Sequence, residues 1–164
     1  NEILLTEIIT NDFFLELEPA EIVAVLSVFI EEKSNEVTNI KMLNVPEKMK
    51  NVLEKINFIS KDFADYEYNC YLEIGTDWNL YLSFVEPAYY WAQGKTMFDI
   101  YKSFGDIYEG TFIRNILRIK NIIDNLKNIS EMLNKSELLK KLENLDSILI
   151  RDQVTTESLY IMKS

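Results

Sequence analysis

Gly105–Leu133, GDIYEGTFIRNILRIKNIIDNLKNISEML, is the stretch that decides the fold of this chain. At about 100° per residue, its apolar side chains share one face of a long helix, while arginines and asparagines share the opposite face. The apolar face comprises Phe112, Ile116, Ile119, Ile123 and Leu126, and the polar face comprises Arg114, Arg118, Asn121, Asn125 and Asn128. Asp106, followed three residues later by Glu109, has the spacing of a helix N-cap with its reciprocal partner. We therefore predict a long helix with Asp106 as its N-cap.

The polar face of this helix has two interpretations. A core helix with a solvated outer face explains the pattern without any ligand, because most polar side chains of globular proteins contact water. The alternative is a helix that presents a ladder of hydrogen-bonding side chains to a polar ligand sliding past it. Periodicity alone does not separate the two.

Composition indicates a single all-α domain. The chain has 164 residues with only four Gly and three Pro, which is few for a loop-rich or all-β protein. Its 17 basic and 27 acidic residues give a net charge of −10, which disfavours a free-standing nucleic-acid binder. The single cysteine, Cys70, has no internal disulfide partner, so a reducing compartment is the simplest assumption. No apolar window reaches membrane-spanning length, so we expect no membrane partner.

Helical patterns cover most of the chain, and they predict a single bundle of about seven helices with one long helix. The chain begins at Asn1 with an apolar start, Ile3-Leu4-Leu5, so we expect residues 1–164 to be one domain excised from a longer protein. A polar loop is expected over residues 33–45. Beside the long helix, helical patterns cover residues 1–10, 20–32, 46–71, 77–82, 86–93, 96–104 and 136–150.

Several kinds of chemistry are absent from the sequence. There is no histidine, which excludes imidazole catalysis and histidine-ligated zinc. Gly94-Lys95-Thr96 has the end of a phosphate-binding loop, but the glycine required five positions earlier is replaced by Tyr89. We therefore interpret Gly94 as a helix C-cap and Thr96 as the next N-cap. The residues alone predict an all-α interaction domain that binds no cofactor and is no self-contained enzyme.

Three groups of motifs run through the chain in order: LLTEI (4–8) with EPAEIVAVLSVFIEEKS (18–34), YYWAQG (89–94) with DIYEGTFIRNILRIKNII (106–123), and IRDQVTTESLYI (150–161). Together they resemble the C-terminal helical domain, called DSHCT, of exosome-associated DExH RNA helicases. The pairing of Asp106 and Tyr108 before Glu109-Gly110 is more similar to the nuclear exosome-cofactor (TRAMP) helicase than to the cytoplasmic superkiller helicase.

The resemblance implies roles for particular residues. In that family the domain is an all-helical bundle that closes an RNA channel beneath two motor domains, and its ratchet helix meets the strand. The E-G-[ST]-x-x-R motif falls on Glu109 to Arg114, and the RNA-contacting arginine falls on Arg118. Asn121 stands where the family often has an acidic residue, and Asn125 continues the same face. The acidic residue of the L-T-E-L motif falls on Glu7, which with Glu109 would have a supporting role.

The resemblance also implies the activity of a larger protein. That protein would be an ATP-dependent 3′–5′ RNA helicase, with ATP and Mg in a motor core outside this chain, which unwinds RNA and threads it to the exosome for processing or decay. Its partners would be single-stranded RNA, the motor domains, the exosome and its cofactors. The expected location is the nucleus, with the cytoplasm as the alternative. Arg151-Asp152 would tie the last helix structurally.

A second function remains open at this point. The chain would instead be a docking module for helicase or exosome cofactors, without direct RNA contact. It would use the polar loop at residues 33–45 and the aromatic surface near Trp78.

Overall fold

The computed structural model describes residues 2–31, 37–70, 76–105 and 107–155, and in these ranges the chain is all-α, as predicted. Eight α-helices lie wholly within the described residues, with two short 3₁₀ helices. The α-helices are α1 (Glu2–Thr10), α2 (Pro19–Leu26), α3 (Glu47–Asn69), α4 (Val85–Ala92), α5 (Met97–Phe104), α6 (Glu109–Met132), α7 (Ser136–Glu143) and α8 (Leu145–Leu149), and the 3₁₀ helices are η1 (Ser27–Phe29) and η2 (Ile40–Met42). None of the helices in the described ranges is long and apolar enough to cross a membrane.

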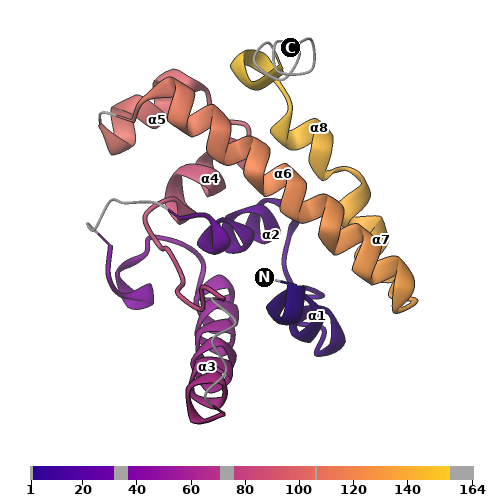
Figure 1. The fold of residues 1–164 in the computed structure, drawn as a ribbon. Coiled ribbons are helices and arrows are strands. Elements are labelled where there is room, and N and C mark those ends of the chain that lie inside the picture. Colours follow the sequence, from indigo (N-terminus) through magenta and orange to yellow (C-terminus); the bar gives the residue numbers. More distant parts are fainter. Residues whose placement is uncertain (1, 32–36, 71–75, 106, 156–164) are drawn as a thin grey trace.

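Helix α2 lies near the centre of the molecule (Figure 1), where it packs against η1, α3, α4 and α6. Its run from Ile22 to Leu26 is completely buried, as expected for a helix that is apolar on all sides. It contacts α3 on one side and both α4 and α6 on another, while α7 and α8 pack along α6. The long helix α6 crosses this assembly with its apolar face inward, so the predicted stripe forms part of the core.

Three helices end in the same kind of turn. A residue with positive φ follows each of α1, α4 and α6. Its N–H and the N–H of the next residue both donate hydrogen bonds to carbonyls of the last helical turn. These residues are Asp12, Gly94 and Asn134, with φ of 55°, 95° and 57°. Thr96 then begins α5 through a capping box with Asp99. The predicted N-cap at Thr96 is confirmed, and Gly94 ends α4 as predicted, directly after Gln93.

The predicted last helix over residues 136–150 is wrong as a single element. It divides at Asn144 into α7 and α8. The break changes the direction of the chain, so that Leu145 and Leu149 are fully buried against the core. It also brings the Leu149 carbonyl to the Trp91 indole, whose Nε1 donates to it over 3.0 Å. Tertiary contacts of α8 therefore outweigh the continuous helical pattern. Leu139, which the helical pattern over 136–150 places on its apolar side, is only half-buried.

The predicted helix over residues 77–82 is also wrong, because this segment is irregular. Its main chain is bound by other parts of the molecule. The Trp78 carbonyl accepts a hydrogen bond from the Ser60 hydroxyl of α3, and the Tyr81 N–H donates to the Val28 carbonyl over 2.9 Å. These bonds occupy groups that a local helix would have needed.

Other predicted helix boundaries and inward positions differ in detail. Helix α6 begins at Glu109 after Tyr108, so Glu109 is its first residue and not the third; Asp106 itself lies outside the described residues. Helix α2 passes into η1 after Leu26, earlier than the predicted end. In α1, the apolar pattern predicts that Ile3 faces inward, but Ile3 is 49% exposed and Ile9 is buried instead. The predicted helix ends at residues 32 and 71, and the motif residues 156–161, fall outside the described residues.

Candidate nucleic-acid interface

The polar face of α6 is accessible to solvent along its length. Arg114, Arg118, Asn121, Asn125 and Asn128 are all exposed, whereas the five predicted apolar residues of the same helix are fully buried. From Arg114 to Asn125 the helix rises by about 16 Å at 1.5 Å per residue. We call Arg114, Arg118, Asn121 and Asn125 the α6 polar face. The structure brings these four predicted site residues together on one straight surface.

The two arginines of this face keep their charges unneutralised. Within the described part of the chain, neither Arg114 nor Arg118 makes an ion pair. The lysines on the flanks of the same helix are paired: Lys120 lies 2.8 Å from Asp124, and Lys127 lies 3.4 Å from Asp146. By helical geometry, no acidic residue between positions 110 and 128 falls on the α6 polar face. In a chain of charge −10, this face therefore presents two available guanidinium groups.

Gly110 lies on the same side of the helix, one turn before Arg114. Nothing comes within 4 Å of the position that a Cβ would take there. The backbone of the first turn is therefore open to close approach, which is a common use of glycine near a ligand. Glu109, which precedes it, is exposed at the first helical position. Burial, and then the Glu109 charge, raise the pKa of the neighbouring Tyr101 hydroxyl.

Glu7, the other predicted supporting residue, is half-buried on α1, a helix that packs against α6. Its main-chain carbonyl and its carboxylate accept from the Asn11 side chain, over 2.8 and 3.2 Å. Among the described residues, no hydrogen bond or ion pair joins Glu7 to the α6 polar face. The structure thus places Glu7 on a neighbouring element without connecting it directly to the arginines.

Arg151 performs the structural role that was predicted for it. Its guanidinium carbon lies 3.6 Å from the Trp91 ring centroid, and its Nη2 donates to the Trp91 and Lys95 carbonyls over 2.7 Å each. The Trp91 carbonyl lies at the C-terminal end of α4, where the helix dipole favours a cation, and the Lys95 carbonyl lies in the connection that follows. Its Nη1 lies 2.8 Å from Asp152. Arg151 therefore holds the segment after α8 against α4.

Sequence reasoning missed Asn115, a buried polar residue on α6. Its exposed fraction is 2%, in contrast to the three exposed asparagines further along the helix. It lies on the edge of the apolar face, beside Phe112 and Ile116, and that position was the available signal.

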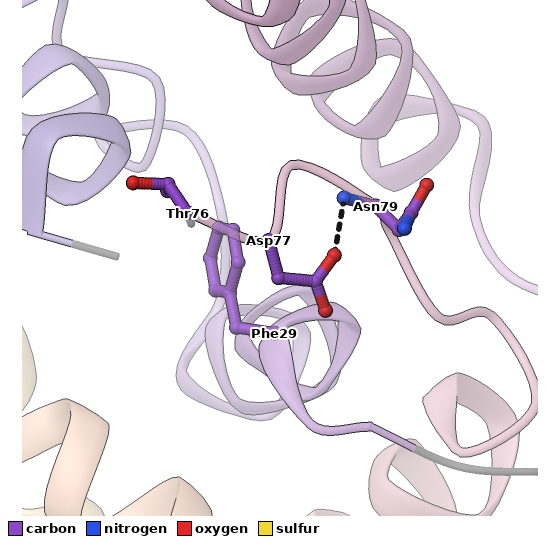
Figure 2. Close-up of a pocket in the computed structure, with 4 residues that line it drawn as sticks. All are labelled: Phe29, Thr76, Asp77 and Asn79. Atoms are coloured by element: carbon purple, nitrogen blue, oxygen red, sulfur yellow. Dashed lines mark hydrogen bonds between the residues drawn. The ribbon is translucent and has the colours of Figure 1, made fainter. Parts of the chain in front are cut away.

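The surface near Trp78 is organised by internal contacts. Trp78 stacks on Phe63 with 5.4 Å between ring centroids, and its indole donates to Glu67. Figure 2 shows a small pocket beside it, formed by Phe29, Thr76, Asp77 and Asn79. One Asp77 oxygen accepts from the Asn79 N–H over 3.0 Å, and the other accepts from the Tyr81 hydroxyl over 2.6 Å. The carboxylate in this pocket therefore supports a local turn.

The described residues contain no group of three or more Cys, Asp or Glu side chains that could hold a metal ion. Gly94 and Thr96 act as helix caps, as described above, so the Gly-Lys-Thr sequence forms a connection between α4 and α5 and not a phosphate-binding loop.

Comparisons with known proteins agree with this architecture. A family model described as the DSHCT (NUC185) domain matches residues 1–156. The chain is 29% identical to the ATP-dependent RNA helicase mtr4 of Schizosaccharomyces pombe over 97% of its own length and 14% of that protein. It is 32% identical to the Exosome RNA helicase MTR4 of Homo sapiens over 75% of its own length and 12% of that protein. The chain therefore spans less than a sixth of the length of these relatives.

Proposed function

The chain belongs to the DSHCT family, and on this premise we propose that residues 1–164 are one helical domain of a larger ATP-dependent RNA helicase. The names of the related proteins, ATP-dependent RNA helicase and Exosome RNA helicase, support this assignment. ATP and Mg would bind in a motor core outside this chain, where hydrolysis takes place. The whole protein would unwind RNA in the 3′–5′ direction and thread it to the exosome, in the nucleus.

Within that protein, the α6 polar face lines the RNA channel that the domain closes. Arg118 contacts the translocating strand, and Arg114 supports it one turn earlier. Guanidinium groups stack on single-stranded bases and form strong hydrogen bonds to phosphates. Asn121 and Asn125 offer amide donors and acceptors to bases and 2′-hydroxyl groups. Glu109 and Glu7 orient the beginning of α6 and its neighbour α1.

The observation that carries this proposal is the pair of exposed, unpaired arginines on a face without carboxylates. Two directed contacts fit a translocating strand better than a broad basic patch, since a strand that must move cannot be held tightly at every phosphate. The remaining positive surface would belong to the motor domains, which reconciles RNA contact with a domain charge of −10.

The test uses the full-length helicase with its motor domains. We expect Arg118→Ala to reduce photo-crosslinking of single-stranded RNA to α6, and the rate of duplex unwinding, by about tenfold, which is typical of one lost charge-assisted hydrogen bond. Lys140→Ala removes one charge from the exposed surface of α7 and serves as the matched control, with unchanged crosslinking. Arg118→Lys should restore part of the activity.

The competing function is a docking module without RNA contact. If Arg118→Ala and Arg114→Ala leave crosslinking and unwinding unchanged while binding of a protein cofactor is lost, the RNA channel role is wrong. ATPase activity measured without RNA should be unaffected by either variant, which separates damage to the motor from loss of the strand contact.

A further inference from the structure

Helix α3 extends beyond the core that it packs against. Its buried residues are Met49, Val52, Leu53, Ile56 and Ser60. None of the residues from 61 to 69 is buried, so about 13 Å of helix continues outside the core. Figure 1 shows α3 projecting from the body of the molecule. Helix α2, which contacts both α3 and α6, lies between the two helices. A helix of this length usually has a partner for its outer end, because helical stability comes mainly from packing.

One side of the projecting helix already has a partner. Ser60, Phe63 and Glu67 lie on one side of α3 and contact Trp78 through its carbonyl, its ring and its indole nitrogen, respectively. These contacts fasten the helix to the irregular segment at residues 76–82. They leave the opposite side uncovered.

We define the outer face of α3 as Glu54, Phe58, Asp62 and Tyr66, which follow one another a turn apart, together with Asp65 beside them. Helical spacing places Phe58, Asp62 and Asp65 opposite the Trp78 contacts, with Glu54 and Tyr66 at the two edges of the face. All five side chains are exposed, and Phe58 and Tyr66 are 73% and 66% accessible. Within the described residues, none of the three carboxylates of this face makes an ion pair. Two aromatic rings two turns apart thus have a carboxylate between them, one turn from each.

The lysines of α3 do not neutralise this surface. Lys55 directs its Nζ toward Phe13, 5.7 Å from the ring centroid. Lys61 lies next to Glu54 and Asp65 by helical spacing, but among the described residues it makes no ion pair with either. It lines a groove of about 410 Å³ on the Trp78 side of the helix, together with Glu54, Asn57 and Asn79. The groove offers amide side chains next to the Glu54 carboxylate, at the edge of the outer face. That combination suits the main chain of an extended peptide.

We propose that the outer face of α3 is a docking site for an arginine-rich extended segment of a separate protein. Arginine matches both features of the face, since its planar guanidinium binds carboxylates through two hydrogen bonds and stacks on aromatic rings. The negative charge disfavours RNA at this surface. The inference does not rest on the RNA-channel proposal, because α3 and the α6 polar face lie on different elements.

The test measures the affinity of the full-length protein for a fluorescein-labelled nine-arginine peptide at fixed, near-physiological salt. Phe58→Ala with Tyr66→Ala should weaken binding about five- to thirtyfold, as expected for two lost cation–π contacts. Asp62→Asn with Asp65→Asn should weaken it comparably. A nine-lysine peptide should bind more weakly than the arginine peptide, because lysine lacks the planar fork.

Matched controls separate a specific site from general attraction to an acidic protein. Glu131→Gln with Glu137→Gln removes the same charge from other exposed positions, and Phe98→Ala with Tyr108→Ala removes two other exposed rings. Both controls should change affinity less than twofold. Equal weakening by all variants would overturn the proposal in favour of non-specific attraction. Absence of peptide binding to the full-length protein would also overturn it, and would indicate that another part of the same polypeptide covers α3.

Discussion

Arg151 is the residue that joins the end of the described chain to its centre. Its side chain is 22% exposed, and its guanidinium donates to one carbonyl at the end of α4 and one in the α4–α5 connection while covering the Trp91 ring. Trp91 in turn donates to Leu149, so α4, α8 and the following segment share one cluster of contacts. Because one side chain makes all of these contacts, its loss should have a large effect on stability.

We expect Arg151→Ala to lower the free energy of unfolding by about 1–3 kcal/mol, through loss of hydrogen bonds from a charged donor and of the cation–π contact. Arg151→Lys keeps the charge but cannot reach both carbonyls. Its free energy of unfolding should therefore lie between those of Arg151→Ala and the wild type. Asp152→Asn, which removes only an exposed partner, should change stability by less than about 0.5 kcal/mol. Urea denaturation of the chain checks all three, and an unchanged midpoint for Arg151→Ala would contradict the structural role.

Asp77 provides a second prediction, on pH. Partial burial acts to raise its pKa, but hydrogen bonds from the Tyr81 hydroxyl and from Asn79 outweigh this and hold the pKa below the usual 3.8. Because the folded-state pKa is lowered, the stabilisation is present above pH 3.8 and is lost as the pH falls through the folded-state value. Tyr81→Phe should therefore raise the pKa of Asp77, measured by NMR titration of its carboxylate. If the pKa of Asp77 is the same in Tyr81→Phe and the wild type, the hydrogen bond from the Tyr81 hydroxyl to Asp77 does not form in solution.

Among the helices, α6 contains a glycine whose conformation does not require glycine. Gly110 is helical and has open space around it, whereas Gly94 at the end of α4 has φ of 95°. The same change to alanine should therefore have opposite effects at the two positions. This pair separates a glycine needed for backbone geometry from one retained for another reason.

We expect Gly110→Ala to raise the free energy of unfolding by about 0.5 kcal/mol, because alanine loses less conformational freedom in a helix. Gly94→Ala should lower it by about 1–2 kcal/mol because of its left-handed backbone. Thermal and urea unfolding of both variants provide the measurement. If Gly110 exists to let RNA approach, Gly110→Ala will also weaken crosslinking in the full-length helicase while stabilising the domain. A lower free energy of unfolding for Gly110→Ala would show that the first turn of α6 tolerates no Cβ.

At the scale of the whole molecule, a net charge of −10 sets the strength of RNA binding by this chain alone. Two arginine–phosphate contacts should give a slope of log affinity against log salt of about −1.4 for a single strand. We therefore expect weak, sequence-independent binding by the chain, measured by fluorescence anisotropy between about 50 and 200 mM salt. Tight sequence-specific binding at physiological salt, or a slope several times steeper, would mean that cationic contacts beyond the α6 polar face dominate.

Much of the fold could be predicted from local patterns. The burial of Phe112 and Ile116, the exposure of Arg118, and the caps at Gly94 and Thr96 each depend on residues within one or two turns, so the sequence is sufficient. The membership in the DSHCT family was likewise carried by short motifs. The RNA contact of Arg118 and the supporting role of Glu7 stay predictions, since they concern a strand that must be supplied by experiment.

The sequence by itself determined the helical class of this protein, the two faces of α6 and most helix ends, because these follow from backbone periodicity and capping. Only the tertiary structure decided the division at Asn144, the irregular segment around Trp78, the partners of Arg151 and the uncovered outer face of α3. Each of these depends on hydrogen bonds or packing between residues far apart in the chain. Local propensity cannot report such contacts, because their energies exist only once the helices are assembled.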